Sequence, residues 1–237
     1  MPSLHCLVFF LFLLFICCET ITVSSDKHSV AEVGKDVTLT CIFEGDSNPT
    51  VIWEKEGVTG TVHMYLNNKD DFSEQHVNYT KRTEVHGSSA SKGNASLTLK
   101  NVRIWDEGSY KCSVNTNKGF GEAEVNLNVW AKSNDGIHIS RKSDEVLSCQ
   151  SSGWYPAPTV TWHDKSGNNL NKDGKLTLTI DNNGLYNMTH DLKQHRNSKN
   201  QYICTIKHKW MEDRIRVVFS DMGAMIRLDD GKDSPEL

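Results

Sequence analysis

Apolar and polar residues alternate with a period of two over long parts of the chain. The alternation is clear in VTLTC (37–41), SLTLKNV (96–102) and KLTLTI (175–180), and Gly, Asn or Asp interrupts it about every 8–12 residues. Successive side chains of a strand point to opposite faces, so this pattern is typical of antiparallel strands that bury one face. The chain is therefore predicted to be all-β.

The N-terminal segment departs from this pattern. Residues 7–18 (LVFFLFLLFICC) are apolar throughout, which is too short a run for a bilayer span of about 20 residues and fits the core of a secretory signal peptide. We predict a signal peptide over residues 1–20, so the mature chain folds in an oxidising compartment. Charges interrupt the C-terminal part, where we expect a polar tail over 221–237 and no transmembrane segment, and hence a secreted chain.

Seven cysteines are present, and four of them lie beyond the signal region: Cys41, Cys112, Cys149 and Cys204. Four cysteines allow three pairings. The first two are 71 residues apart and the last two 55 residues apart, so the two intervals occupy separate halves of the chain.

Each half carries the same markers around its two cysteines. A tryptophan follows the first cysteine, as Trp53 and Trp162, and a tyrosine stands two positions before the second, as Tyr110 and Tyr202. In immunoglobulin-like sandwiches the two cysteines cross-link the sheets, the tryptophan packs on the bridge, and the tyrosine hydroxyl caps a corner. We therefore predict two tandem immunoglobulin-like β-sandwiches, with a disulfide joining the two cysteines of each half.

The two halves are predicted to be of different types. The longer interval leaves room for two additional strands, at 61–66 and near 70–80, as in a variable-type domain over residues 25–130. The shorter interval suits a seven-stranded constant-type domain over residues 133–220.

Smaller features also favour a variable-type first half. Asp106 lies at a corner where Arg82 can meet it. The glycines of GFGEAEVNLNV (119–129) predict a β-bulge at the start of the last strand of this domain.

Composition adds little to this picture. The 237 residues suffice for two domains of about 100–120 residues each. The formal net charge of −4 gives no argument for nucleic acid or an anionic membrane surface as a partner.

Residues that could bind a metal or catalyse a reaction lack the required spacing. No His-Glu-x-x-His or Cys-x-x-Cys arrangement is present, 67–71 (NNKDD) lacks the glycine and glutamate of a calcium loop, and 87–91 (GSSAS) is not a nucleophile elbow. We expect no metal, no cofactor and no enzymatic activity. The histidines considered are His138, His163, His190, His195 and His208.

Several motifs resemble those of the B-seven/butyrophilin family of T-cell co-signalling ligands. They include IWEKEG (52–57), KGNASLTLKNVRIWDEGSYKC (92–112), SGWYPAPTVTWHDKSGNNL (152–170) and YICTIKH (202–208). The likeness covers about residues 30–220 and is greatest for the branch of V-set T-cell activation inhibitors and HERV-H LTR-associating ligands. It implies a ligand that binds a lymphocyte surface receptor through the front sheet of its variable-type domain and dampens T-cell activation.

Alternation places a set of side chains on the outer face of that sheet, because Trp53, Tyr110 and Cys112 point inward. The resemblance implies that this face contacts the receptor. The alternative is a solvated sheet face. The predicted receptor-binding residues are Ile52, Glu54, His63, Tyr65, Lys111, Ser113, Asn115 and Phe120.

An alternative function is a cell-adhesion module that makes homophilic or heterophilic contacts through the same sheet in a two-fold arrangement. We expect a monomer or a weak dimer.

Three sequons predict N-glycosylation, at Asn78, Asn94 and Asn187, whereas Pro49 spoils a fourth at Asn48. Bulky glycans belong on the surface. The first two sequons are expected in strands opposite or beside the proposed face, where glycans would leave that face accessible.

The segment GWYPAPTVTW (153–162) is rich in aromatic residues, which are common in interfaces, so a recognition loop is one interpretation. The favoured interpretation is structural. Trp162 enters the core of the constant-type domain, and the Tyr155–Pro156 peptide bond is predicted to be cis.

Overall fold

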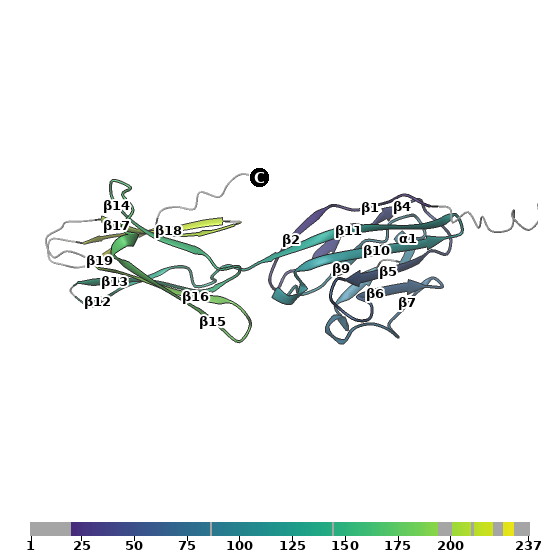
Figure 1. Cartoon of the computed structure of the whole chain (residues 1–237), viewed down its shortest axis with the longest axis horizontal. Coiled ribbons are helices and arrows are strands. Elements are labelled where there is room, and N and C mark those ends of the chain that lie inside the picture. Colours follow the sequence, from purple (N-terminus) through teal and green to yellow (C-terminus); the bar gives the residue numbers. More distant parts are fainter. Residues whose placement is uncertain are drawn as a thin grey trace, which may run out of the picture. The chain divides into compact units, whose positions relative to one another are not determined.

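The computed structural model describes residues 20–85, 87–143, 145–193, 201–209, 211–219 and 225–229. The predicted signal peptide up to residue 19 and His195 lie outside these residues. The chain divides into two compact units, Met1–Asn128 and Val129–Leu237. Both units are antiparallel β-sandwiches, so the predicted all-β fold with two immunoglobulin-like domains is confirmed (Figure 1).

In the first unit a six-stranded sheet of order β2-β11-β10-β5-β6-β7 packs against a three-stranded sheet of order β3-β9-β8, and β1 pairs with β4. Its elements are β1 (Val23–Ser24), β2 (His28–Glu32), β3 (Val37–Leu39), β4 (Ile42–Phe43), β5 (Thr50–Lys55), β6 (His63–Leu66), β7 (Lys69–Asp71), the 3₁₀ turn η1 (Val77–Tyr79), β8 (Thr83–Val85), α1 (Gly87–Ala90), β9 (Leu97–Leu99), η2 (Ile104–Asp106), β10 (Gly108–Thr116) and β11 (Gly119–Trp130).

The two additional strands of the variable type are β6 and β7. They form a hairpin whose two-residue turn, Asn67–Asn68, has φ values of 54° and 59°. Asparagine tolerates this left-handed conformation, which two-residue hairpin turns favour. The second additional strand is shorter than the predicted 70–80, because β7 ends at Asp71 and η1 follows.

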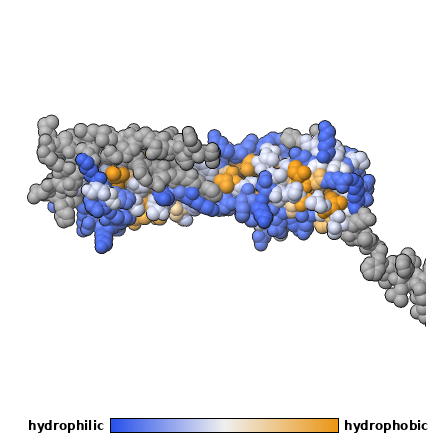
Figure 2. Space-filling view, turned by 90° about the horizontal axis from the view of Figure 1, so that it is seen from above, coloured by the Kyte–Doolittle hydropathy of each residue, from blue (hydrophilic) through white to orange (hydrophobic). Residues whose placement is uncertain are grey.

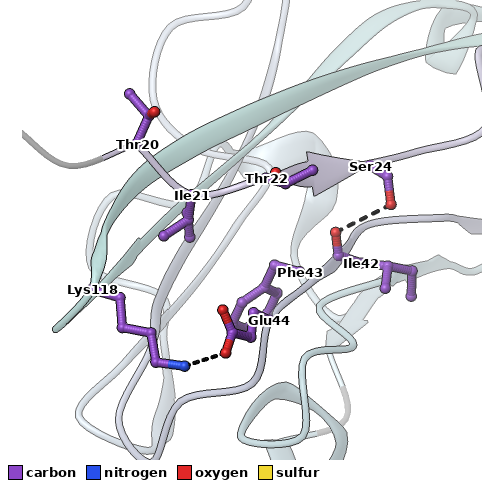
Figure 3. Close-up of a pocket in the computed structure, with 8 residues that line it drawn as sticks. All are labelled: Thr20, Ile21, Thr22, Ser24, Ile42, Phe43, Glu44 and Lys118. Carbon is purple, nitrogen blue, oxygen red and sulfur yellow. Dashed lines mark hydrogen bonds and ion pairs between the residues drawn. The ribbon is translucent and has the colours of Figure 1, made fainter.

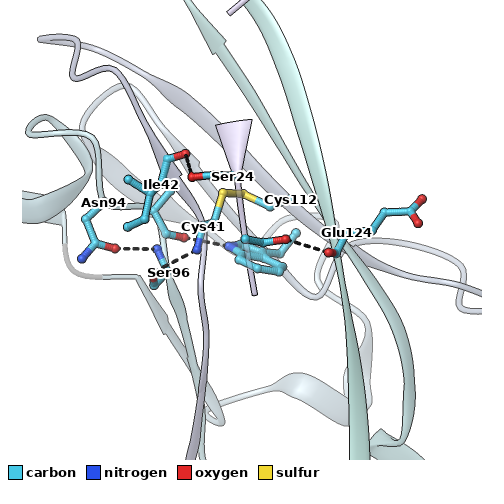
Figure 4. Close-up of a disulfide and its surroundings, with 10 residues drawn as sticks. Ser24, Cys41, Ile42, Asn94, Ser96, Cys112 and Glu124 are labelled. Atoms are coloured by element: carbon cyan, nitrogen blue, oxygen red, sulfur yellow. Dashed lines mark hydrogen bonds between the residues drawn. A yellow bond between two sulfur atoms is a disulfide. The ribbon is translucent and has the colours of Figure 1, made fainter. Parts of the chain in front are cut away.

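The disulfide Cys41–Cys112 links the two sheets of the first unit (Figure 4). The core of this unit also contains Trp53. Trp53 is fully buried and donates from Nε1 to the carbonyl of Ala95 at 2.9 Å. Cys41 N donates to the hydroxyl of Ser96 at 3.0 Å. A cross-link that closes a loop of this length stabilises the fold by roughly 4 kcal/mol in the chain-entropy account.

A buried ion pair closes the corner of the first unit, as the sequence predicted. Arg82 donates to both carboxylate oxygens of Asp106, at 3.2 and 2.5 Å. Tyr110 donates its hydroxyl proton to the carbonyl of Asp106 at 2.7 Å, and its hydroxyl lies 3.3 Å from that of Tyr79. Burial raises the pKa of Tyr79 to about 12 and raises that of Tyr110 further, so both hydroxyls remain protonated hydrogen-bonding groups.

The predicted β-bulge at the start of β11 is wrong for the β10–β11 ladder, whose register runs without a shift from Gly108↔Leu127 to Thr116↔Gly119. The structure gives another reason for glycine at position 121. A Cβ there would lie 2.4 Å from the carbonyl oxygen of Ile21. Gly121 therefore lets the N-terminal segment lie close to β11.

The second unit packs a sheet of order β12-β13-β16-β15 against a sheet of order β14-β17-β18-β19. Its elements are β12 (His138–Ser143), β13 (Val146–Trp154), β14 (Thr159–Asp164), η3 (Asn171–Asp173), β15 (Gly174–Ile180), β16 (Tyr186–Lys193), β17 (Gln201–His208), β18 (Met211–Phe219) and β19 (Met225–Asp229).

The core of the second unit surrounds the disulfide Cys149–Cys204. Trp162 is fully buried in this core and donates from Nε1 to the carbonyl of His190 at 3.1 Å. The Tyr155–Pro156 bond is cis, as predicted. The segment 153–162 therefore connects β13 to β14 and delivers Trp162 into the core.

The C-terminal segment departs from the predicted polar tail. Residues 225–229 form β19, which pairs antiparallel with β18 from Ile215↔Asp229 to Phe219↔Met225. The tail prediction is therefore wrong for these residues. The rest of 221–237 lies outside the described residues.

Candidate functional site

The outer face of the six-stranded sheet carries most of the side chains that the sequence proposed for recognition. In the β5–β10 ladder, Lys111 lies opposite Glu54, and Ser113 opposite Ile52. Their neighbours along each strand, such as Trp53 and Cys112, are fully buried. The predicted outward orientation of β5 and β10 is therefore correct.

The predicted outward orientation of His63 and Tyr65 is wrong. His63 pairs with Trp53 and Tyr65 with Val51, so both side chains share the inward face, with exposures of 0% and 5%. A shift of one residue in register moves every side chain of a strand to the other face. The outward residue of β6 opposite Ile52 is Met64.

His63 has a structural role at this position. One ring nitrogen lies 3.0 Å from the hydroxyl of Thr83, and the other lies 3.0 Å from a carboxylate oxygen of Asp70. Gln75 also donates to the Thr83 hydroxyl, at 2.8 Å. This network ties β6 to β7 and to β8 of the opposite sheet.

Three rows of outward side chains cross the sheet in the observed register. Phe120 lies opposite Asn115, at the end where β10 turns into β11, and is 40% exposed. The rows are Glu124–Lys111–Glu54, then Glu122–Ser113–Ile52–Met64–Asp71, then Phe120–Asn115–Thr50. An apolar centre, Ile52 and Met64, therefore lies between acidic residues on both sides.

Sequence reasoning missed Met64, Glu122 and Glu124. The glutamates alternate with Gly121, Ala123 and Val125, so the period of two in β11 carried a signal for them. Met64 could not be found in this way, because its face depends on the register of β6 against β5.

Lys111 is the central charge of this face. Its ammonium lies 3.4 Å from a carboxylate oxygen of Glu54 and 3.8 Å from one of Glu122, and Glu124 faces it in register. All these side chains are partly or fully exposed, so each pair contributes on the order of 1 kcal/mol or less to folding. With one lysine and three glutamates, the face keeps an excess of negative charge.

The sequons of the first unit lie away from these rows. Asn78 is exposed in η1, and Asn94 is exposed just before β9 of the opposite sheet. The Asn94 side chain accepts a hydrogen bond from Ser96 N at 3.0 Å (Figure 4). Glycans at both positions remain a prediction.

An open depression of about 660 Å³ lies elsewhere on the first unit, between the N-terminal segment and β4 (Figure 3). A Lys118–Glu44 ion pair stands at one side of it. The lining residues are Thr20, Ile21, Thr22, Ser24, Ile42, Phe43, Glu44 and Lys118. This lining offers a weakly apolar surface with one neutralised charge pair.

The surface of the first unit mixes apolar and hydrophilic areas (Figure 2, right). Large apolar side chains that are exposed there include Val30, Ile42, Phe72, Val77, Trp105 and Phe120. Within the residues described, no group of three or more His, Cys, Asp or Glu side chains could hold a metal ion. The same residues contain no helix that is long and apolar enough to cross a membrane.

A variable-type sandwich followed by a constant-type one, each with a disulfide between its sheets, defines a tandem immunoglobulin-superfamily protein. The immunoglobulin V-set domain family matches residues 24–130. The butyrophilin subfamily 3 member A2-like Ig-C domain matches residues 132–214.

Two relatives share the name V-set domain-containing T-cell activation inhibitor 1. The Rattus norvegicus protein is 35% identical over 186 residues, covering 76% of this chain and 66% of that protein. The Homo sapiens protein is 33% identical over 196 residues, covering 80% and 69%. The crystal structure of bovine butyrophilin has a similar fold, with a TM-score of 0.74 at 24% identity, over 84% of this chain and 99% of that one.

The chain belongs to the B-seven/butyrophilin family of immunoglobulin-superfamily proteins. It spans about two thirds of the length of the two T-cell activation inhibitors.

Proposed function

We propose that this protein is an immune co-signalling ligand that binds a lymphocyte surface receptor through the outer face of β5, β6, β10 and β11. The observation that carries the proposal is that face itself, where Ile52 and Met64 form an apolar centre flanked by charged residues. Interfaces commonly combine an apolar centre with a charged rim. Relatives named as T-cell activation inhibitors favour an inhibitory effect.

The excess of negative charge suggests what the receptor presents. A receptor surface with basic residues around an apolar centre would be attracted to Glu54, Glu122 and Glu124. Such complementarity speeds association and selects the partner more than it sets affinity. Binding is therefore expected to weaken as salt is raised.

The test is binding of the purified chain to a panel of lymphocyte-receptor ectodomains, followed by charge reversal on the proposed face. Lys111→Glu and Glu54→Lys are expected to change binding to the identified receptor at least about tenfold, the effect of a contact worth about 1.4 kcal/mol.

The opposite sheet provides a matched control. Lys100 and Glu84 form an exposed ion pair at 2.8 Å, with side-chain exposures close to those of Lys111 and Glu54. Lys100→Glu and Glu84→Lys are expected to leave binding unchanged. Equal effects of both pairs, or no effect of either, would show that the receptor binds elsewhere.

The direction of signalling requires a separate measurement. Immobilised chain is expected to reduce cytokine release from T cells stimulated through their antigen receptor, and the Glu54→Lys variant, which makes the face less acidic, to do so less. An increase in cytokine release would contradict the inhibitory assignment while leaving the binding face intact.

A further inference from the structure

An apolar stripe runs along β15 in the second unit. Leu176, Leu178 and Ile180 are 40%, 39% and 61% exposed. In register they lie opposite His190, Met188 and Tyr186 of β16, so they share the face that points to the core. The alternation in this strand is the pattern of a buried face, yet these three side chains remain open to solvent.

β15 is also an edge strand. It pairs with β16 on one side, and it ends the described sheet of order β12-β13-β16-β15 on the other. Its pairing with β16 runs from Gly174 to Ile180 without a register shift. Natural edge strands are usually short, charged, bulged or interrupted by proline, because a regular edge invites another strand to pair with it.

The backbone of the stripe is oriented for such pairing. Asp181 N donates to the carbonyl of Leu185 across the β15–β16 hairpin, at 2.9 Å. Backbone groups of a strand alternate between its two sides. The N–H and C=O groups of Ile180, Leu178 and Leu176 therefore point to the free edge.

We propose that β15 is a self-association surface, and that its occupant is β15 of a second copy of this chain in a two-fold, antiparallel arrangement. In an antiparallel pair centred on Leu178, the residue numbers of every two opposed residues add up to the same value. Leu178 then faces Leu178, Leu176 faces Ile180, and Lys175 faces Asp181 of the other copy. Neighbouring registers that keep the apolar face on one side place Lys175 opposite Thr179 or Asn183 instead.

This register is self-complementary in both shape and charge. A two-fold interface requires such a match, because the same surface of both copies is in contact. If residue i of one copy contacts residue j of the other, then residue j of the first copy also contacts residue i of the second. Cross-strand apolar pairs and opposite charges each favour pairing. The Asp181 carboxylate is held in place by hydrogen bonds from the backbone N–H groups of Asn183 and Leu185, at 2.8 and 2.9 Å.

The predicted glycan leaves the stripe open. Asn187 lies opposite Thr179, whose side chain points to the other face of the sheet from Leu178 and Ile180. A glycan at Asn187 would therefore project from the outer face, away from the apolar stripe.

The test is sedimentation equilibrium of the full chain from a eukaryotic secretory host at about 1–100 µM, a range that detects micromolar dissociation constants. The wild-type chain is expected to form a dimer. Leu178→Lys sets two lysines opposite each other at the two-fold axis and is expected to weaken dimerisation at least about tenfold. Leu178→Met keeps an apolar contact of similar volume and is the matched control.

A charge exchange makes the test independent of any folding defect in Leu178→Lys. Lys175→Glu and Asp181→Lys each place like charges opposite each other twice and are expected to be monomers. Their equimolar mixture has only opposite-charge pairs and is expected to form a heterodimer. Circular dichroism melts check that each variant is folded.

Three results would overturn the proposal. They are a wild-type chain that stays monomeric, a wild-type dimer that Leu178→Lys and both charge variants leave intact, and a mixture no more dimeric than its components. The second result would place the dimer contact on another surface, such as the outer face of the first unit. If the stripe instead binds a different protein, the chain alone would stay monomeric at all concentrations, which is the first of these results.

Discussion

Arg82 and His63 of the first unit and His190 of the second are all buried, but their surroundings differ. In the first unit the Arg82 guanidinium binds both oxygens of Asp106 and three backbone carbonyls, and both ring nitrogens of His63 lie within hydrogen-bonding distance of a partner. In the second unit His190 is 3% exposed, and its Nδ1 has no hydrogen-bond partner among the residues that the structure describes.

The difference is instructive because a buried polar group stabilises a fold only when it is paired. The ion pair of the first unit is expected to be costly to break, although it contributes little net stability over an apolar pair. The histidine of the second unit is expected to make that unit sensitive to pH.

The largest effect is expected from removing one member of the buried pair. Arg82→Met leaves the Asp106 carboxylate buried without its partner and is expected to lower the unfolding free energy of the first unit by about 3–5 kcal/mol. The matched control is Arg103→Met. Arg103 also lies over the ring of Trp105, at 5.7 Å against 5.0 Å for Arg82, but it is exposed.

Differential scanning calorimetry of both variants checks this prediction. A change of less than about 1 kcal/mol is expected for Arg103→Met. Similar losses in the two variants would mean that stacking on Trp105, and not the ion pair, stabilises this corner.

A smaller effect is expected from filling the space at two glycines. A Cβ at Gly121 would meet the backbone oxygen of Ile21 at 2.4 Å, whereas one at Gly174 would meet the Nε2 atom of His190 at 2.4 Å. Overpacking typically costs about 1–3 kcal/mol. Because a backbone can yield less easily than a side chain, Gly121→Ala is expected to cost more than Gly174→Ala. Urea denaturation of each variant measures the order, and the reverse order would show that His190 is held rigidly.

The second unit is expected to lose stability in mild acid. Burial lowers the pKa of His190 below its ordinary value of 6.5. Burial also lowers the pKa of His208, and this effect outweighs the hydrogen bond to the Tyr155 carbonyl, which raises the pKa. As the pH falls through 6.5 the unfolded chain takes up protons that the folded unit does not. The stability of the second unit is therefore expected to fall from pH 7.5 to 5.5 and to level off below the folded-state pKa values.

Calorimetry across this range, with His190→Gln and the exposed His138→Gln as control, checks the assignment. His190→Gln is expected to flatten the pH dependence, and His138→Gln to leave it unchanged. An equally steep loss in the first unit would contradict the contrast between the two units.

The sequence could predict features that depend on local spacing. The two disulfides, Trp53 and Trp162 follow from a pattern of cysteine, tryptophan and tyrosine present in both halves, and they lie where this pattern indicates. The Arg82–Asp106 pair follows from the corner motif of the first half and also lies where predicted. A motif of this kind determines where its residues lie within a single sandwich.

Features set by long-range pairing could not be predicted. The face of His63 depends on the register of β6 against β5, which no local pattern encodes. KLTLTI (175–180) alternates like any strand with a buried face, but the exposure of Leu176, Leu178 and Ile180 depends on how far the opposite sheet extends. Alternation therefore identifies which side chains share a face and not whether that face is covered.

The smallest effect on stability is expected on the proposed receptor-binding face. Lys111→Ala removes two exposed ion pairs, at 3.4 and 3.8 Å, and is expected to change the unfolding free energy by less than about 1 kcal/mol. The same variant leaves Glu54, Glu122 and Glu124 without their shared cation, so it makes the face more acidic. Association with a basic receptor is then expected to become faster and more salt-dependent, measured by surface plasmon resonance at two ionic strengths. A slower association would mean that Lys111 itself contacts an acidic group of the receptor, and that the acidic rim is not the attracting feature.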